Sequence, residues 1–279
     1  MAEADALDLN RAHWDALAAV HGQDRCYDSE GLAAGRVGLR AIEAAAVAEA
    51  IGDVRDRDVL HLQCHIGFDT IALARQGARV TGLDFSPGSL DKAAALAARC
   101  GVQVHWVQAD VTRLPAALRA RFDLVYATIG VLCWIDDVGA WMRSAAAALR
   151  PGGRLALVEL HPFYEMVAAV DPLRLDFPYA FDGPHRFDEP GSYADPDASV
   201  DATATVEYGH SLAEIVSAAI AAGLRIEALH EHLEADFDPR GSMLTPGADG
   251  RYRLEVSGER LPILFTLVAA QPGGRSPTQ

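Results

Sequence analysis

A carboxylate stands at the end of an apolar stretch, shortly after a loop that contains a glycine. Residues 59–63 are predicted as a buried strand leading into the loop 64–67, and a second buried strand ends at Asp84. Strand, turn, helix and strand form half of a nucleotide-binding α/β sheet, in which ligands lie at the carboxyl ends of the strands. An ionised carboxylate accepts hydrogen bonds through two oxygens, which suits the two hydroxyls of a ribose. The sequence therefore predicts a small cofactor that contains a ribose.

An alternation of strands and helices would position this loop and Asp84. The predicted strands are residues 59–63, 79–84, 103–108, 123–128 and 154–160, and the helices between them are 68–76, 88–99 and 138–149. Such alternation implies parallel strands with right-handed crossovers, which is a doubly wound α/β core. Ser86 and Pro87 are typical of a helix start. Residues 149–153, Leu-Arg-Pro-Gly-Gly, are typical of a helix end.

The alternation stops after Leu160 for nearly fifty residues. This segment interleaves prolines with aromatic side chains: Pro162, Pro172, Pro178, Pro184, Pro190 and Pro196, and Phe163, Tyr164, Phe177, Tyr179, Phe181, Phe187 and Tyr193. A long irregular segment in a compact domain is usually functional or disordered, and aromatic density favours ordered packing. We therefore expect a substrate lid here.

Five regions follow from this pattern. They are an N-terminal helical cap with helices 8–20 and 37–51 (residues 1–55), a cofactor-binding core (56–161), the lid (162–209), a segment that completes the sheet (210–270) and a loose tail (271–279). Within the completing segment, helix 210–222 and strands 224–233 and 261–270 are predicted, with a polar loop 238–250 between the strands.

Composition excludes several classes of partner. The net charge of −15 argues against a nucleic-acid partner, because phosphate binding needs a basic surface, so a small-molecule substrate is expected. The four cysteines, Cys26, Cys64, Cys100 and Cys133, show no disulfide or zinc spacing, and no metal is expected. No apolar run is long enough to span a bilayer, and the start of the chain is acidic where a signal peptide would be basic. We expect a cytoplasmic protein without a membrane partner, for which a homodimer is possible.

Several short motifs in their order resemble one family. They are the loop Leu-His-Leu-Gln-Cys-His-Ile-Gly ending at Gly67, the strand ending at Asp84, Gln-Ala-Asp-Val at 108–111, Phe-Asp-Leu-Val-Tyr at 122–126 and Leu-Arg-Pro-Gly-Gly-Arg-Leu at 149–155. Over residues 55–270 the chain resembles the class I S-adenosylmethionine-dependent methyltransferases, within a small-molecule subgroup. The resemblance implies a Rossmann-like, seven-stranded sheet whose last two strands form an antiparallel edge.

The resemblance also implies a set of cofactor contacts. Gly67 would lie under the methionine part of S-adenosylmethionine, Asp84 would accept from the ribose hydroxyls, and Asp110 would accept from the adenine amino group. The residues implied to bind the cofactor are Gln63, His65, Gly67, Asp69, Asp84, Phe85, Ser86, Asp110, Val111 and Thr128.

The first loop departs from the common family pattern. That pattern has an acidic residue at the place of His61 and glycines at the places of Gln63 and His65, where the backbone must approach the ligand closely. Either Gln63 and His65 reach the cofactor carboxylate by hydrogen bonds, which we favour, or the loop has widened and binding is weakened. His61, in mid-strand, is expected to be an internal histidine with a hydrogen-bond partner.

Methyl transfer from a sulfonium is a direct displacement, in which a base is needed only if the acceptor must lose a proton. His161 follows strand 154–160, His210 opens a late helix and Tyr27 lies in the N-terminal cap, so these three are the candidate catalytic residues. Each of them could instead be structural. Trp134 is expected to pack in the core. His230 and His232 face the same way on one strand, but no third ligand accompanies them.

The sequence therefore favours methyl transfer to a nitrogen, oxygen or activated carbon of a small aromatic or amino-acid-derived metabolite, in a biosynthetic role. One alternative is a non-catalytic protein of the same fold that serves as a binding or regulatory partner, which the missing glycines suggest. A nicotinamide-dependent oxidoreductase also has a strand, turn, helix and strand that ends at Asp, but it needs a G-x-G-x-x-G loop, and this loop holds one glycine.

Overall fold

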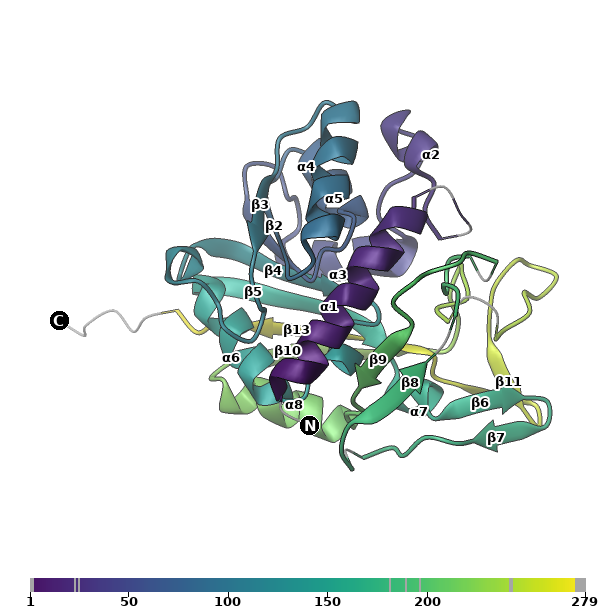
Figure 1. Cartoon of the computed structure of the whole chain (residues 1–279). Coiled ribbons are helices and arrows are strands. Elements are labelled where there is room, and N and C mark those ends of the chain that lie inside the picture. The colour runs from purple at the N-terminus through teal and green to yellow at the C-terminus, as the bar shows by residue number, and fades with distance from the viewer. Residues whose placement is uncertain are drawn as a thin grey trace.

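A seven-stranded sheet forms the centre of the protein in a computed structural model (Figure 1). The structure describes residues 3–22, 24, 26–180, 182–188, 190–195, 197–240 and 243–273. The expectations for Phe181, Pro196 and the tail beyond residue 273 lie outside these residues. The strand order is β10-β13-β5-β4-β1-β2-β3. This is the Rossmann-like, seven-stranded α/β sheet expected from the sequence.

Five strands of this sheet run parallel: β1 (Asp58–Leu62), β2 (Arg79–Asp84), β3 (His105–Gln108), β4 (Phe122–Thr128) and β5 (Leu149–Leu160). The other two are β10 (Arg225–His232) and β13 (Leu264–Ala270). The strand β13 lies antiparallel between β5 and β10. The predicted antiparallel edge is thus confirmed, and the carboxyl ends of β1, β2, β4 and β5 meet on one edge of the sheet.

Helices cover both faces of the sheet. They are α3 (Ala41–Ile51), α4 (Phe68–Arg75), α5 (Pro87–Arg99), α6 (Val138–Ala148) and α8 (Leu212–Ala221). Adjacent residues of β1 enter different cores: Val59 packs with side chains of α3 and α4, and Leu60 packs with side chains of α6 and α8. A strand buried on both faces is apolar without alternation, which is why residues 59–62 read as a buried strand.

The N-terminal segment divides into two parts with different roles. The helix α1 (Glu3–Val20) packs against α5 and the lid strand β9 (Ala204–Glu207), and the short helix α2 (Ser29–Ala33) packs on α4 and α5. By contrast, α3 packs on β4, β5 and β13 and forms part of the layer over the sheet. Only part of the predicted N-terminal cap therefore lies away from the sheet.

The lid contains more regular structure than its sequence predicted. It begins with α7 (Pro162–Glu165) and continues as two hairpins, β6 (Val167–Val170) with β7 (Leu173–Leu175), and β8 (His185–Asp188) with β9. The buried side chain of Asn10 in α1 holds the second hairpin. Its amide donates to Val206 O at 2.8 Å and its oxygen accepts from Val206 N at 2.8 Å. This amide substitutes for a neighbouring strand.

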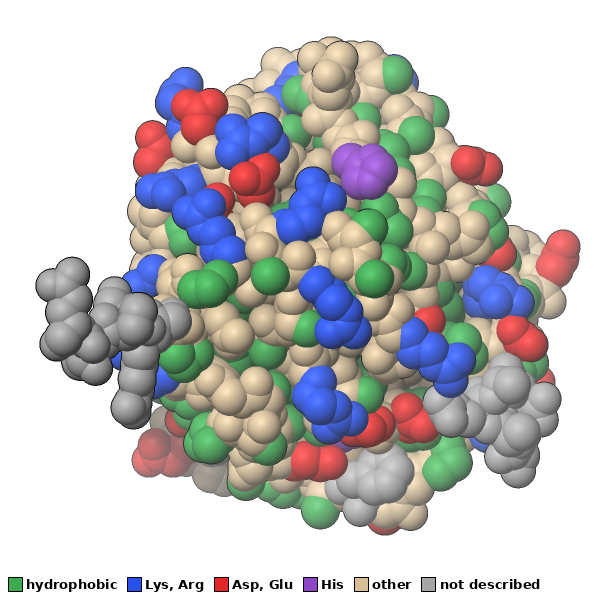
Figure 2. Space-filling view, turned by 90° about the vertical axis from the view of Figure 1, so that its left-hand side faces the viewer, with side chains coloured by type: hydrophobic (Ala, Val, Ile, Leu, Met, Phe, Trp, Pro, Cys, Tyr) green, Lys and Arg blue, Asp and Glu red, His purple; other side chains and the backbone are tan. Residues whose placement is uncertain are grey.

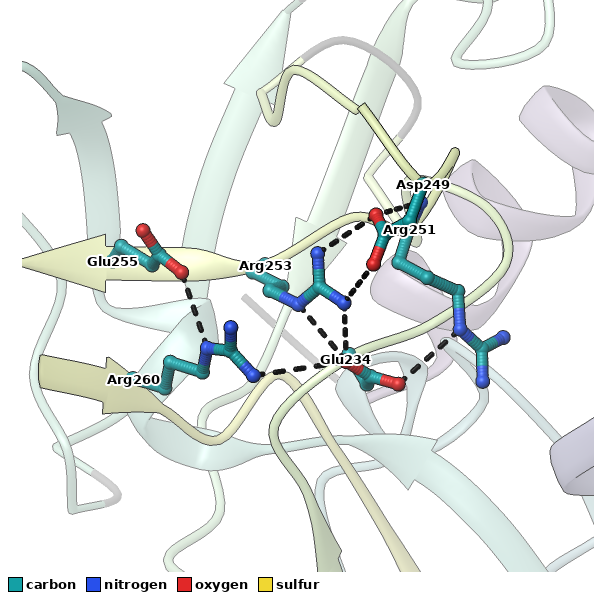
Figure 3. A network of polar contacts seen from close by, with 6 residues as sticks. All are labelled: Glu234, Asp249, Arg251, Arg253, Glu255 and Arg260. Atoms are coloured by element: carbon teal, nitrogen blue, oxygen red, sulfur yellow. Dashed lines mark hydrogen bonds and ion pairs between the residues drawn. The ribbon is translucent and has the colours of Figure 1, made fainter. Parts of the chain in front are cut away.

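A further hairpin, β11 (Leu254–Val256) with β12 (Glu259–Leu261), was not predicted. Its polar face carries a network of ion pairs centred on Glu234 and Arg253 (Figure 3). Arg253 Nη2 lies 2.7 Å from Glu234 Oε2 and 2.6 Å from Asp249 Oδ2, and Arg251 also pairs with Glu234. The network joins the end of β10 to the loop that follows it, which carries Phe237, Asp238 and Arg240.

The opposite edge of the sheet, at the amino ends of the parallel strands, is rich in charge. Figure 2 views this side of the molecule and shows arginine or lysine side chains interspersed with carboxylates. Arg79 pairs with Asp58 at 2.8 Å, and Asp123 receives both Arg57 and Arg150. These pairs close the amino edge. Within the described residues, no helix is long and apolar enough to cross a bilayer.

Candidate functional site

A cavity of about 990 Å³ lies at the carboxyl edge of the sheet, lined also by the N-terminal segment and the lid. Small-molecule sites usually have volumes of roughly 300–1,000 Å³, so this one has room for two ligands side by side. All but one of the residues implied to bind the cofactor line it: Gln63, His65, Gly67, Asp69, Asp84, Phe85, Asp110, Val111 and Thr128. The exception, Ser86, is buried and caps α5 by accepting from Ser89 N at 3.0 Å.

The loop after β1 keeps a left-handed backbone although only one glycine remains. The φ angles are +52° at Gln63, +47° at His65 and +76° at Gly67. Non-glycine residues in this region cost about 1–2 kcal/mol each, so surrounding contacts must hold them there. A Cβ at Gly67 would lie 2.6 Å from the ring of Trp106, so this position requires glycine.

The side chains of Gln63 and His65, at positions where the family pattern has glycines, form hydrogen bonds with other residues of the protein. Gln63 donates from Nε2 to Val131 O at 2.9 Å and accepts from Trp141 Nε1 at 2.7 Å. His65 lies 3.0 Å from Ser89 Oγ through Nδ1 and 2.8 Å from His21 Nδ1 through Nε2. These contacts supply the support that the left-handed backbone needs, and they hold the loop after β4 and the N-terminal cap against the first loop.

Asp84 ends β2 as a buried carboxylate with an incomplete set of partners. Its Oδ2 accepts from His65 N at 2.8 Å and its Oδ1 from Ser86 N at 2.9 Å. A carboxylate has about four acceptor positions on its two oxygens, so Asp84 can accept further hydrogen bonds from a ligand. Burial, with a smaller contribution from Asp15, raises the pKa of Asp84 to about 6 against the effect of the backbone amides.

Asp110 and Asp69 also line the cavity, with their own partners. Asp110 Oδ1 accepts from Thr112 N at 2.8 Å and from Thr112 Oγ1 at 2.7 Å, so this residue also fixes the turn after β3. Asp69 Oδ2 accepts from Thr128 Oγ1 at 3.0 Å. Burial raises the pKa of Asp69 and that of the nearby Glu43. The like charge of Asp69 raises the pKa of Glu43 further.

A chain of hydrogen bonds joins the first loop to the lid. It runs from Ser89 through His65 and His21 to Ser192 in the lid, and the last step, His21 Nε2 to Ser192 Oγ, is 2.6 Å long. Beside it, the hydroxyls of Tyr27 and Tyr193 lie 2.5 Å apart. Burial lowers the pKa of His21 to about 4 and that of His65 well below its usual value, so both rings are neutral at pH 7.

The structure brings two of the three catalytic candidates to the cavity. Tyr27 and His210 line it, whereas His161 does not. His161 instead caps α7, accepting from Phe163 N at 3.1 Å, and its Nε2 lies 2.8 Å from Glu231 Oε1. His161 thus caps a helix and is not among the residues that line the cavity.

The two residues at the cavity are constrained. Burial raises the pKa of Tyr27 well above its usual value, so its phenol stays protonated and can serve as a hydrogen-bond donor. His210 Nε2 donates to Ile135 O at 2.6 Å, and Nδ1 lies 3.5 Å from Glu214 Oε1. A base role for His210 must use Nδ1.

Aromatic residues at the cavity include some that sequence analysis missed. Trp134, expected in the core, lines the cavity and meets Trp14 edge to face, with ring centroids 5.2 Å apart. Trp14 also meets His65 edge to face at 4.8 Å. The helical spacing of α1 places Trp14, Leu17 and His21 on one side, a signal that could have been recognised.

The loop after β4 is held by a buried carboxylate. Glu159 in β5 accepts hydrogen bonds from the backbone amides of Gly130, Val131, Leu132 and Leu160. Burial raises the pKa of Glu159, and the four amides act in the opposite direction. Glu159 therefore fixes the loop that carries Val131 and Trp134 into the cavity.

The histidines expected to be structural have partners. His61 Nδ1 lies 2.8 Å from Thr70 Oγ1, and burial lowers its pKa to about 3. His230 pairs with Glu49 and His232 with Thr266. Among the described residues, no group of three or more His, Cys, Asp or Glu side chains has metal-binding geometry, and all four cysteines are unbonded to one another.

Residues 59–153 match the family model described as a methyltransferase domain. A malonyl-[acyl-carrier protein] O-methyltransferase of Hahella chejuensis is 38% identical over 101 residues, 36% of this chain and 35% of that protein. A ubiquinone biosynthesis O-methyltransferase of a Methylobacterium species is 40% identical over 95 residues, 34% of this chain and 37% of that protein. The chain thus spans little more than a third of each of these relatives.

Solved structures extend the likeness to most of the chain. An S-adenosylmethionine-dependent methyltransferase from Mesorhizobium loti has a TM-score of 0.58 at 22% identity and covers 82% of this chain and 98% of its own. A magnesium protoporphyrin IX methyltransferase from Synechocystis, solved with bound S-adenosylhomocysteine, has a TM-score of 0.50 at 18% identity and covers 83% of this chain and 80% of its own. Residues 59–153 of the chain therefore match a methyltransferase domain, and the chain as described has the fold of S-adenosylmethionine-dependent methyltransferases.

Proposed function

We propose that this protein transfers the methyl group of S-adenosylmethionine to a small aromatic or amino-acid-derived acceptor, in a biosynthetic role. The observation that carries the proposal is Asp84, a buried carboxylate that lines a cavity bordered by the left-handed loop 63–67. That arrangement fits a ribose beside a close backbone approach. The methyltransferase domain over residues 59–153 contains both features.

The cavity residues divide the work of binding between them. Asp84 binds the ribose hydroxyls, Asp110 accepts from the adenine amino group, and Gly67 leaves space under the methionine part. When bound, S-adenosylmethionine supplies a methyl group on a sulfonium, ready for direct displacement. The chain's own contribution is to orient the acceptor and to exclude water, which lowers the activation barrier. The lid and the N-terminal cap, joined through His21 and Ser192, enclose the acceptor.

The accepting atom is a nitrogen, an oxygen or an activated carbon. Two relatives are named as O-methyltransferases, which supports oxygen as one possibility. The charge of −15 supports a small molecule over a nucleic acid as the acceptor. We propose Tyr27 as a donor to the acceptor and His210 Nδ1 as a base where one is required.

Titration calorimetry with S-adenosylhomocysteine tests the cofactor. We expect one site per chain and a rise in melting temperature that follows mass action. Asp84→Ala should remove most of this binding, whereas Asp136→Ala, at an exposed position away from the cavity, should leave it unchanged. If the unaltered protein shows no heat and no thermal shift at saturating cofactor, the proposal fails and the protein is a non-catalytic member of the fold.

A further inference from the structure

One carboxylate on the acceptor side of the cavity differs from the others in its surroundings. Glu165 ends α7, is half-buried and lines the cavity. Among the described residues, none donates a hydrogen bond to its carboxylate or lies within ion-pair distance of it. Its neighbour Glu159, with four backbone amides, shows how this fold satisfies a carboxylate that serves structure alone. Glu165 is arranged differently.

Other acidic residues lie near Glu165 and affect its pKa. Glu159 and Glu207 both act on it as like charges, and burial with these charges raises the pKa of Glu165 well above its usual value. Arg240 acts in the opposite direction on this pKa, but its Nη1 donates to Val167 O at 2.6 Å and to Tyr164 O at 3.2 Å. Among the described residues, no arginine forms an ion pair with Glu165.

The position of Glu165 separates it from the cofactor contacts. In the strand order, β2 and β3 lie on one side of β1, and β4 and β5 lie on the other. Asp84 and Asp110 follow β2 and β3, whereas Glu165 follows β5. Its carboxyl group is thus available to the second ligand.

Aromatic rings complete the wall. Phe177, Tyr179 and Phe187 from the lid line the same cavity as Glu165, together with Trp134 and Tyr208. The rings of Phe177 and Phe187 lie 5.8 Å apart between centroids, inclined at 58°. Aromatic faces attract cations, and a carboxylate in a partly desolvated site attracts them more strongly. An anionic group would meet repulsion from Glu165 and Glu207.

We propose that the methyl acceptor carries a positively charged amine, which pairs with Glu165 inside the aromatic wall of the lid. This inference rests on the proposed methyl transfer and narrows its acceptor to cationic aromatic amines. Glu165 is a recognition residue in this scheme: it supplies the counter-charge that the bound amine needs. The ammonium hydrogens supply the donors that the carboxylate lacks.

Matched probes of one shape and different charge test the proposal. The set is tryptamine, tryptophol and indole-3-propionate, with phenethylamine, 2-phenylethanol and 3-phenylpropionate as the smaller-ring series. Each is titrated calorimetrically into the full-length protein saturated with S-adenosylhomocysteine at pH 7.5. We expect at least one amine to bind at least tenfold more tightly than its matched alcohol, and neither acid to bind measurably.

Variants locate the effect. Glu165→Gln should lower amine affinity at least tenfold, leave alcohol affinity unchanged and keep the cofactor affinity within twofold. Glu255→Gln, at an exposed position on the β11–β12 hairpin, should change none of these values. The melting temperature without ligand gives a second measurement: it should rise or stay level in Glu165→Gln, because a carboxylate without partners is removed, whereas a structural role would lower it.

The outcomes separate the two proposals. If S-adenosylhomocysteine does not bind, the methyltransferase function itself fails. If the cofactor binds but neither amine does, if an acid binds as well as its amine, or if Glu165→Gln retains full amine affinity, the inference about Glu165 is wrong and the proposed methyl transfer stands.

Discussion

The two halves of the cavity treat their polar groups in opposite ways. On the β2 and β3 side, Asp84 and Asp110 each hold backbone amides before any ligand arrives. On the β5 side, the Glu165 carboxylate has no such partner among the described residues. Preorganised acceptors suit a cofactor that is the same in every turnover. A carboxyl group without protein partners leaves its hydrogen bonds to a ligand.

The largest effect should follow from disturbing the preorganised half at Gly67. A Cβ there would lie 2.6 Å from Trp106 and 2.9 Å from the Ala93 Cβ, in a left-handed backbone. Gly67→Ala should cost about 3 kcal/mol of unfolding free energy, from the sum of backbone strain and overpacking. Chemical denaturation measures this cost.

Gly101→Ala is the matched control, because Gly101 has a φ of +68° and a Cβ added there would meet no atom within 4 Å. It should cost only about 1 kcal/mol, the strain alone. Equal losses of unfolding free energy in the two variants would mean that the loop around Gly67 can move to make room for the added Cβ. The β2 and β3 side of the cavity would then not be rigidly preorganised.

The next effect concerns the charge of Asp84. Its pKa of about 6 lies above the usual carboxyl value, so the protein carries a proton there as the pH falls below about 6. A protonated carboxyl group is a weaker acceptor and has a donor in place of one acceptor position, so the dissociation constant of S-adenosylhomocysteine should rise as the pH falls through 6. Asp84→Asn should bind about 100-fold more weakly at pH 7.5, and its affinity should be flat from pH 7.5 to 5. A wild-type affinity equally flat over this range would remove Asp84 from the ribose site.

A smaller effect is expected at His21, between the two halves. Its folded pKa of about 4 lies below the unfolded value of 6.5, so the unfolded chain binds the proton first and stability is lost as the pH falls from 6.5 toward 4. Up to about 2 kcal/mol should be lost between pH 6.5 and 5 through this residue. His21→Gln, neutral throughout, should show a shallower fall in melting temperature over this range, and a slope equal to that of the wild type would contradict the assignment.

The smallest effect is expected far from both halves, in the exposed network of Figure 3. Exposed ion pairs contribute little, because water and salt screen them and ordering long side chains costs entropy. Arg260→Gln should lower the melting temperature by no more than about 2 °C and leave both ligand affinities unchanged. A large loss would show that the hairpin holds the loop with Phe237 and Arg240 in place for the acceptor.

The fold, and the place of Asp84 and the first loop at the cavity, could be predicted because their signals are local. The buried strands read as apolar runs, Ser86 and Pro87 predicted the start of a helix within one residue, and Asp84 had to follow its strand. The acceptor half depends on contacts between distant segments. The Asn10 amide pairs with β9 across the chain. His161 reaches Glu231 of β10 only in the folded sheet, where β13 alone separates β10 from β5. Neither contact leaves a pattern in the neighbouring sequence.

The loop with Gln63 and His65, where the common family pattern has glycines, could be predicted only in part. The sequence showed that Gln63 and His65 replace glycines but offered two outcomes, contact with the cofactor carboxylate or a widened loop. The backbone retains the left-handed angles, and the side chains turn to Trp141, Ser89 and His21. Tertiary contacts thus compensate for a conformation that the residue types disfavour, which only the folded chain reveals.

The series Ser89, His65, His21 and Ser192 has a directional property. A neutral imidazole donates through one ring nitrogen and accepts through the other, so two imidazoles in contact must share one orientation of their protons. If Ser89 donates to His65, His21 donates to Ser192, and if Ser89 accepts, Ser192 donates. The four residues therefore have two tautomeric states, and all three hydrogen bonds reverse together. If the proton on His65 moves from one ring nitrogen to the other, Ser192 in the lid changes between acceptor and donor.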